Sequence, residues 1–537
     1  MEKWEIIDIG KSDNSKAYQT DFKPALIPQP DILSYEEGAS FLIYKNLIIV
    51  TTTTDFHKEA EYLQHVIQEL TGDTLEIKDK EEEGSHVIKL KNEYVHTYTN
   101  HSNKDEAYSV TIEPSSLTIN AGARLGILNG IHTLKQIIVQ AKEYNDSQIL
   151  LPHMSLNDIP KFQHRGLLLD CGRHFFSTQT VQKYIDLLAY YKMNILHWHL
   201  TEDQGWRIEI DQYPLLNKIS SWRTEKDGSR YGGFYTKKEI KEIVTFAAKR
   251  GITIIPEIEL PGHAQAALAA YPQFSCIGSG IKVANDWGIF KEIYCAGNDG
   301  TFEFLENILK EVMELFPSEY IHIGGDEAPK DRWEKCPKCQ KRIQEEGLHD
   351  EHELQSYFIQ RIEKFLNANG RKLIGWDEIL EGGLSPNAAV QSWRGMEGGI
   401  TAANEAHEAI MSPQSHCYFD HSLKEINLER VYSFDPIPAG LELDKQKYII
   451  GGECNMWTER VPNADNLDSK VFPRILAMSE VLWSYPKERN FKEFRSRVQK
   501  HYAYLKLKNV KYGDETFHTI FRQVLKLFPR MEKFLYE

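Results

Sequence analysis

The sequence predicts an α/β protein in which a (β/α)8 barrel of the TIM type follows a smaller α/β domain. The chain has 537 residues, more than one ordinary domain holds. Between residues 165 and 457 it carries eight short, nearly continuous apolar runs, most of them separated by long amphipathic patterns of helical period. Strands that are apolar on both faces and alternate with helices are typical of a closed parallel sheet.

The first part of the chain predicts the smaller domain. Residues 1–22 are polar and form an N-terminal extension, and residues 23–158 form a small α/β domain of an antiparallel sheet plus helices. Proline and turn residues between 151 and 162 indicate the boundary with the barrel. The expected elements are a strand at 46–53, a helix at 57–72 that stops at a glycine, a hairpin at 108–122 and a helix at 124–141.

The barrel is expected at residues 159–490. Its predicted strands are 165–170, 194–201, 252–260, 320–325, 372–379, 388–394, 408–413 and 447–457. The clearest helices between them are 180–193, 236–251, 302–316 and 351–370. The segment after the seventh strand is long and irregular, so a seventh helix is in doubt. Residues 491–537 are expected to form a helical segment that packs on the barrel.

Composition excludes some classes of function. A net charge of −15 disfavours nucleic acid as a partner, since a polyanion would be repelled. No apolar run reaches the roughly 18–20 residues that a membrane span needs, so no membrane partner is expected. The first twenty residues hold no apolar signal core, which predicts a cytoplasmic protein, or a secreted one if a signal was removed. Oligomeric state is left open.

The cysteines suggest a reducing compartment, because seven is an odd and sparse number for this length. Cys336 and Cys339 form a lone C-x-x-C. A zinc site usually needs a second such pair, and the sequence shows none. We therefore expect structural cysteines, with a redox or metal role as the less favoured alternative, and no metal or cofactor in the active site.

Acids and tryptophans follow the predicted strands, and in barrels of this type the functional residues lie at the carboxyl ends of the strands. The stretch "HIGGDE" ends in Asp326 and Glu327. Neighbouring side chains on a regular strand point to opposite faces. Gly324 and Gly325 permit a kink that could turn both acids toward one site.

Three tryptophans at strand ends, Trp376, Trp393 and Trp457, indicate a pocket for a compact amphipathic ligand. A sugar ring has an apolar face that stacks on aromatic rings and a rim of hydroxyls that needs polar partners. Candidate partners for those hydroxyls are Arg165, Asp420 and Glu459.

Taken together, these stretches resemble family-20 glycoside hydrolases, the β-N-acetylhexosaminidases. "HIGGDE" resembles the family's H-x-G-G-D-E signature. The resemblance extends in order through "HRGLLLDCGRHF", "NILHWHLTEDQGWRIEI", "PEIELPGHAQAALAAYP", "GWDEIL", "QSWRG", "YFD" and "GGECNMWTE". The stretches "ALIPQP" and "ARLGILNGIHTLKQII" resemble the family's N-terminal α/β domain, so about residues 23–500 are covered.

The resemblance implies an exo-acting retaining hydrolase that removes terminal β-linked N-acetylglucosamine or N-acetylgalactosamine. The mechanism would be substrate-assisted, with the 2-acetamido oxygen attacking C1 to give an oxazolinium intermediate. Glu327 would be the general acid and base, and Asp326 would hold the acetamido N–H. Preference between the two epimers, and the natural aglycone, are left open.

Further site residues carry over by position. Tyr418 would donate to the acetamido carbonyl, the three tryptophans would enclose the sugar, and Arg165, Asp420 and Glu459 would bind ring hydroxyls. His263 and Asp203 resemble a pair that connects behind the general acid. Glu202 stands where relatives often have Asp, so the choice between Glu202 and Asp203 is open.

Four alternatives stay open at this point. A disaccharide-releasing member of the family would need a deeper pocket. A non-catalytic sugar-binding protein would have no need for two adjacent acids. An ordinary retaining glycosidase would use Asp377 or Glu378 as its nucleophile. A metal hydrolase could use "HWH" at 197–199, although the chain has no H-E-x-x-H.

Overall fold

The computed structural model describes residues 19–51, 56–81, 85–95, 103–485 and 489–514. The chain forms two compact units, which divide between Ile159 and Pro160. Residues 27–29 belong with the second unit. Most of the expected N-terminal extension and residues 515–537 of the expected C-terminal segment lie outside the described residues.

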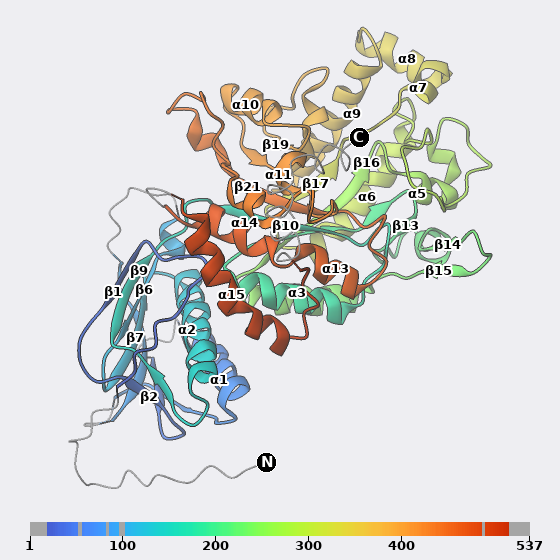
Figure 1. The fold of residues 1–537 in the computed structure, drawn as a ribbon. Coiled ribbons are helices and arrows are strands. Elements are labelled where there is room, and N and C mark those ends of the chain that lie inside the picture. The colour runs from blue at the N-terminus through green and yellow to red at the C-terminus, as the bar shows by residue number, and fades with distance from the viewer. Residues whose placement is uncertain (1–18, 52–55, 82–84, 96–102, 486–488, 515–537) are drawn as a thin grey trace, which may run out of the picture. The chain divides into compact units, whose positions relative to one another are not determined.

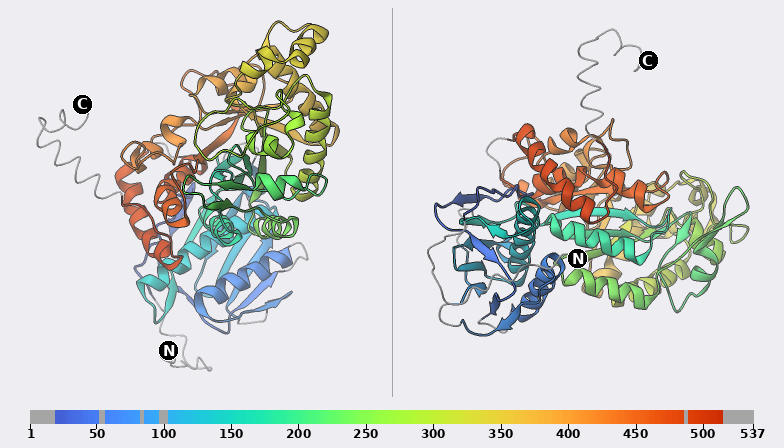
Figure 2. Two further views of the ribbon diagram at one scale, coloured as in Figure 1. Left: turned by 90° about the vertical axis from the view of Figure 1, so that its right-hand side faces the viewer. Right: turned by 60° about the horizontal axis from the view of Figure 1, so that its bottom comes forward.

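The first unit contains a seven-stranded sheet in the order β1-β9-β6-β7-β5-β3-β4. Pairings from β1 to β7 are antiparallel, and those from β7 to β4 are parallel. Figures 1 and 2 show two helices, α1 (His57–Thr71) and α2 (Arg124–Tyr144), side by side along one face of this sheet. The strands are β1 (Ile32–Tyr35), β3 (Ile48–Thr51), β4 (Glu76–Lys78), β5 (Val87–Asn92), β6 (Tyr108–Ile112), β7 (Ser116–Ala121) and β9 (Met154–Asp158); β2 (Phe41–Ile43) and β8 (Ile149–Leu151) form a separate pair.

The second unit contains the predicted barrel, which is confirmed as eight parallel strands closed in the order β10-β11-β16-β17-β18-β19-β20-β21. Its strands are β10 (His164–Asp170), β11 (Ile195–His199), β16 (Thr253–Leu260), β17 (Tyr320–Gly324), β18 (Lys372–Trp376), β19 (Ala389–Ser392), β20 (Ala409–Met411) and β21 (Ile449–Met456). Nearly every residue of these strands is buried. This is why the strands read in the sequence as continuous apolar runs rather than alternating ones.

The interior of the barrel is layered. An apolar cluster lies toward the amino ends of six strands and consists of Ile195, Ile255, Ile374, Ala389, Ile410 and Ile450. Above it lies a buried layer of charged side chains built around Glu257 and Glu453. The working mouth of such a barrel lies above this layer, at the carboxyl ends of the strands.

The outer helices follow the predicted pattern in part. The long helices are α3 (Thr178–Tyr190), α4 (Lys237–Ala248), α6 (Asp299–Leu315) and α9 (Glu351–Ala368), with a shorter α10 (Glu397–Asn404). Between β18 and β19 the described chain forms only a 3₁₀ turn, Asp377–Leu380. After β20 it forms two short helices, α11 (Gln414–Cys417) and α12 (Leu428–Tyr432), in agreement with the expected irregularity.

The last helices cover the point where the barrel closes. α14 (Arg474–Trp483) is buried along its whole length and packs on β10 and β21. α15 (Phe491–Leu507) packs on α3, where the rings of Tyr190 and Tyr504 stack with centroids 3.7 Å apart. Within the described part of the chain, no helix combines the length and apolarity that crossing a membrane requires.

Candidate active site

The end of β17 has the kink that the sequence suggested. Gly324 and Gly325 have φ angles of 68° and 94°, and Glu327 also lies in the left-handed region with φ 43°. A Cβ on Gly324 would lie 1.8 Å from Oε2 of Glu259, so a side chain does not fit there. Alternation along the strand is broken, and Asp326 and Glu327 are brought to one site.

His263 is the point where the two acids meet. Its Nε2 lies 3.6 Å from Oδ2 of Asp326 and 3.6 Å from Oε2 of Glu327. The two acids differ in exposure, because the side chain of Asp326 is 12% exposed and that of Glu327 is 33% exposed. The carboxylate of Glu327 is therefore accessible to solvent, while that of Asp326 is largely buried.

Behind His263 lie both acids between which the sequence could not decide. Nδ1 of His263 is 2.8 Å from Oε1 of Glu202 and 3.3 Å from Oδ2 of Asp203. Glu202 is therefore the nearer partner, while Asp203 also accepts the backbone N–H of Gln265 at 2.9 Å. Burial raises the pKa of Asp203 to about 6, and the charge of Glu202 adds to this shift.

The surroundings of His263 favour its protonated form. Burial opposes its ionisation, but the negative charges of Glu202 and Asp326 outweigh burial and raise its pKa well above the usual value. Burial also opposes ionisation of Glu202, and Arg173 and His263 reverse this and hold its pKa well below the usual range. A buried charge needs such compensation, so these residues form one electrostatic unit.

Arg173, just beyond the carboxyl end of β10, is the cationic centre of the mouth. Its guanidinium contacts Glu202 at 3.3 Å, Glu459 at 3.3 Å and Asp170 at 3.2 Å. It also lies over the ring of Trp457, 5.0 Å from the centroid. The predicted hydroxyl ligand Glu459 is thus placed at the site by an arginine that sequence reasoning did not single out.

The prediction for Arg165 is wrong. Arg165 lies at the amino end of β10, where its guanidinium donates to the carbonyls of Lys192 at 2.9 Å and Phe162 at 2.7 Å. It is 1% exposed and packs over Trp483. A ligand at the carboxyl mouth does not reach this end of the strand. Strand direction was the signal that could have selected Arg173 within the same stretch, "HRGLLLDCGRHF".

Four aromatic rings form a continuous wall. The centroids are 5.8 Å apart for Trp376 and Trp457, 6.5 Å for Tyr418 and Trp457, and 6.1 Å for Trp393 and Tyr418. Hydrogen bonds fix two of the indoles, since Trp376 donates to Glu257 and Trp393 donates to Glu378, both at 2.9 Å. The three predicted tryptophans and Tyr418 are therefore brought together.

Four buried carboxylate oxygens have no hydrogen-bond partner among the described residues, and two of them, Oδ1 of Asp326 and Oδ1 of Asp420, belong to predicted site residues. An orphaned buried acceptor is costly, so oxygens of this kind indicate where a ligand donates. Burial raises the pKa of Asp420, and the neighbouring charge of Glu459 raises it further. The charge of Glu459 thus acts on Asp420, and the binding of ring hydroxyls by these two acids stays a prediction.

Glu378 also belongs to the site. The sequence indicated it only as the nucleophile of the alternative, ordinary retaining glycosidase. It accepts from the indole of Trp393, and burial together with the charge of Asp326 raises its pKa to about 8. Its neighbour Asp377 is occupied by Arg394 at 2.5 Å and by the backbone N–H of Trp393 at 3.0 Å. These contacts make Asp377 a structural residue.

The "HWH" histidines lie below the mouth in the charged layer. His197 contacts Glu453 at 2.7 Å and Glu257 at 3.1 Å, and His199 contacts Glu257 and Glu202. Burial opposes their ionisation, but these carboxylates raise the pKa of His197 to about 9 and that of His199 to about 10. Both histidines are thus engaged by carboxylates in the charged layer.

Comparison with known proteins covers both units of the chain. The catalytic-domain model of glycosyl hydrolase family 20 matches residues 162–486, and the model of that family's domain 2 matches residues 23–159. A β-hexosaminidase of Porphyromonas gingivalis is 41% identical over 91% of this chain and 64% of its own length. Others, from Vibrio furnissii and Akkermansia muciniphila, are each 34% identical, over 71% and 76% of this chain and 66% and 85% of their own.

The chain thus spans about two thirds of the length of the first two of these relatives. Among solved structures, the exo β-N-acetylglucosaminidase of Vibrio harveyi in complex with N-acetylglucosamine is 29% identical with a TM-score of 0.81. That match covers 94% of this chain and 80% of the other. The β-N-acetylhexosaminidase of Bacteroides fragilis is 31% identical with a TM-score of 0.78, over 91% of this chain and 96% of the other.

Proposed function

This chain belongs to glycosyl hydrolase family 20, and from that membership we propose that it is an exo-acting retaining β-N-acetylhexosaminidase. The proposed substrate is a carbohydrate with a terminal β-linked N-acetylglucosamine or N-acetylgalactosamine. The observation that carries the proposal is the meeting of Asp326 and Glu327 at His263. Two adjacent acids of different exposure suit a reaction in which the substrate supplies the nucleophile.

The proposed chemistry assigns the acids different targets. Glu327, the exposed one, protonates the glycosidic oxygen and then activates the water that completes hydrolysis. Asp326 accepts the acetamido N–H on its orphaned Oδ1 and balances the positive charge of the oxazolinium intermediate. Tyr418 donates its hydroxyl to the acetamido carbonyl, whose oxygen attacks C1 while the bond to the aglycone breaks.

The surrounding residues bind and orient the sugar. The apolar ring face and the acetamido methyl pack on the wall of Trp376, Trp393 and Trp457. Ring hydroxyls donate to Asp420 and Glu459, and Arg173 supplies the donors that were expected from Arg165. His263, kept positive by Glu202, fixes both acids and compensates their charge.

A substrate panel tests this proposal. We expect hydrolysis of 4-nitrophenyl β-N-acetylglucosaminide and β-N-acetylgalactosaminide, negligible turnover of the plain β-glucoside, and strong inhibition by a thiazoline analogue of the intermediate. Comparable turnover of the plain glucoside would favour an ordinary retaining glycosidase with Glu378 as nucleophile. Binding without turnover would favour a non-catalytic sugar-binding protein.

We also propose a cytoplasmic location, on the ground that all seven cysteines are unpaired in the structure. Fractionation of the source cells, with the activity assayed in each fraction, tests this. Activity confined to the medium or the cell envelope would contradict it.

A further inference from the structure

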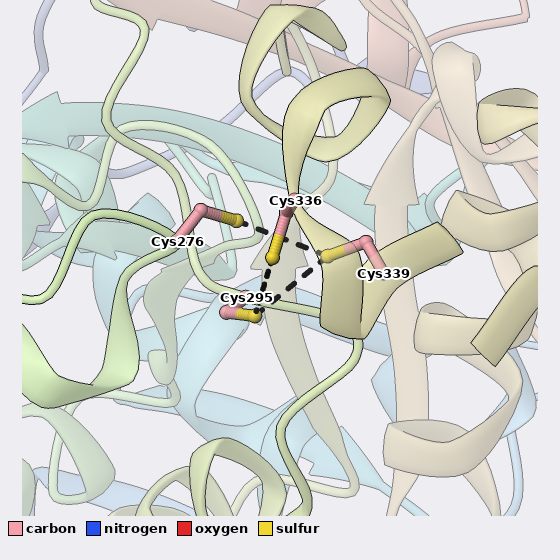
Figure 3. A group of neighbouring side chains, drawn as sticks. All are labelled: Cys276, Cys295, Cys336 and Cys339. Carbon is pink, nitrogen blue, oxygen red and sulfur yellow. Dashed lines mark hydrogen bonds between the residues drawn. The ribbon is translucent and has the colours of Figure 1, made fainter. Parts of the chain in front are cut away.

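Four of the seven cysteines lie together away from the residues assigned above. Figure 3 shows the side chains of Cys276, Cys295, Cys336 and Cys339 pointing toward a common centre. The first two lie in the segment between β16 and α6, Cys336 lies between α7 (Asp331–Lys335) and α8 (Pro337–Glu346), and Cys339 lies in the first turn of α8. Cys295, Cys336 and Cys339 are buried, and Cys276 is partly exposed. The cluster therefore joins two segments that are far apart in the sequence.

The spacing of the sulfurs matches a tetrahedral metal site. The Sγ–Sγ distances are 3.8 Å for Cys276–Cys339, 3.8 Å for Cys295–Cys336 and 3.7 Å for Cys295–Cys339. All four sulfurs lie within 4.8 Å of one another. A Zn–S bond of about 2.3 Å implies tetrahedron edges of about 3.8 Å, whereas a disulfide would bring two sulfurs to about 2.05 Å.

The backbone around the cluster is arranged as for a thiolate site. Cys336 directly precedes Pro337 at the first turn of α8, and Cys339 lies in that turn, where the partial positive charge of the helix end stabilises thiolates. Gly297 packs closely on α8, since a Cβ there would lie 2.1 Å from the carbonyl carbon of Lys338.

We propose that Cys276, Cys295, Cys336 and Cys339 bind a structural zinc ion. Four thiolates in tetrahedral array leave no open coordination position, so the ion would hold the fold rather than take part in the reaction. From the sequence a metal role for these cysteines was only the less favoured alternative, because only Cys336 and Cys339 show a metal-site spacing. Cys276 and Cys295 are separated by a loop whose length matches no short zinc motif.

Hydrogen bonds link the cysteine cluster to the loops that carry active-site residues. Tyr294, next to Cys295, donates its backbone N–H to the carbonyl of Pro261 at 3.0 Å, two residues before His263. The indole of Trp333, three residues before Cys336, donates to the carbonyl of Tyr294 at 2.9 Å. The ion would thus tie the loop of His263 to the loop that follows Glu327.

The metal content of the purified full chain tests the proposal. Protein prepared without a metal-affinity step should contain one zinc per chain by inductively coupled plasma mass spectrometry. Cys336→Ser and Cys339→Ser should each lose most of it, and Cys454→Ser, at a buried thiol outside the cluster, should retain it. Zinc retained in both cluster variants would refute the assignment.

Cluster variants can misfold, so a second measurement uses the unaltered protein. Titration with a mercurial should release one zinc, detected with a chromogenic chelator, as the four thiolates are consumed. Protein stripped of zinc and loaded with Co²⁺ should show the visible absorption of tetrahedral cobalt thiolate.

Three results would overturn the proposal. They are stoichiometric iron in place of zinc, a disulfide among the four cysteines by mass spectrometry of non-reduced peptides, and four freely alkylated thiols in protein that contains no metal.

Discussion

Replacing Asp326 by asparagine separates the charge of this side chain from its shape. Asparagine has nearly the same volume and keeps one carbonyl acceptor, but it removes the negative charge that lies 3.6 Å from His263. In the proposed reaction that charge stabilises a cationic intermediate and accepts the acetamido N–H. Asp326→Asn should therefore lower kcat far more than it raises KM.

The magnitude follows from two contributions. A hydrogen bond to a charged group contributes about 1.5–3 kcal/mol, and Oδ1 of Asp326 has no other partner among the described residues. Two unit charges about 4 Å apart near a protein surface interact by about 4 kcal/mol. Because the neutral amide keeps part of the first contribution and the contributions overlap, we expect a loss of about 3–4 kcal/mol, or roughly 10²–10³-fold in kcat.

The assay is steady-state hydrolysis of 4-nitrophenyl β-N-acetylglucosaminide near neutral pH, with folding checked by circular dichroism and melting temperature. Asp468→Asn is a matched control, because Asp468 is equally a buried acid but contacts Lys183 and Tyr184 in the outer shell of the barrel. The control should lose stability and keep its kcat. Full activity of Asp326→Asn on 2-acetamido substrates would refute the division of roles between the two acids.

Three further predictions concern other residues of the mouth. Arg173→Lys should lower kcat/KM by about 10²-fold, because lysine does not reproduce a guanidinium shared by three acids. Arg165→Lys should lower the melting temperature and leave KM nearly unchanged. Equal effects of the two substitutions on KM would contradict the placement of Arg165 outside the sugar site. Glu327→Gln should lose about 10²–10⁴-fold in kcat and the limb of the pH–rate profile that reports the general acid, and an unchanged profile would exclude Glu327 from that role. The pKa of Glu378 is about 8 in the folded protein and near 4.5 in the unfolded chain. Between these pH values the folded protein holds a proton that the unfolded chain has released, so the stability of the wild type falls as the pH rises from about 4.5 to 8. Glu378→Gln carries no such proton, and its melting temperature should exceed that of the wild type by a few degrees at pH 8 but not at pH 4; no difference at pH 8 would contradict the raised pKa of Glu378.

The barrel was predictable because burial on both faces gives each parallel strand a plain signature. The run at 252–260 is one example, since its many apolar positions indicated a buried strand, and the strand has a neighbour on either side. The kink at Gly324 and Gly325 was likewise predictable, because two consecutive glycines directly before an acid pair permit backbone angles that residues with a side chain rarely adopt. The barrel strands and the kink both depend on residues that are adjacent in the sequence, so both could be predicted from short stretches of it.

What the sequence did not provide is direction and long-range proximity. Arg165 and Arg173 occupy the same short stretch, and only the path of β10 shows that they lie at opposite ends of a strand. Glu202 and Asp203 are adjacent, and both reach His263, so no choice between them was possible from position alone. Cys276 and Cys295 join Cys336 and Cys339 only through the packing of two loops.

The left-handed backbone at the mouth has an evolutionary consequence. His263 and Glu327 are non-glycine residues with φ of 46° and 43°, a conformation that costs about 1–2 kcal/mol per residue. His263 also compensates buried carboxylates, so stability helps to retain it. Glu327 has a side chain that is 33% exposed, so selection for stability alone would favour glycine there. A descendant of this chain that has lost the activity should therefore drift toward glycine at position 327 before its barrel strands change.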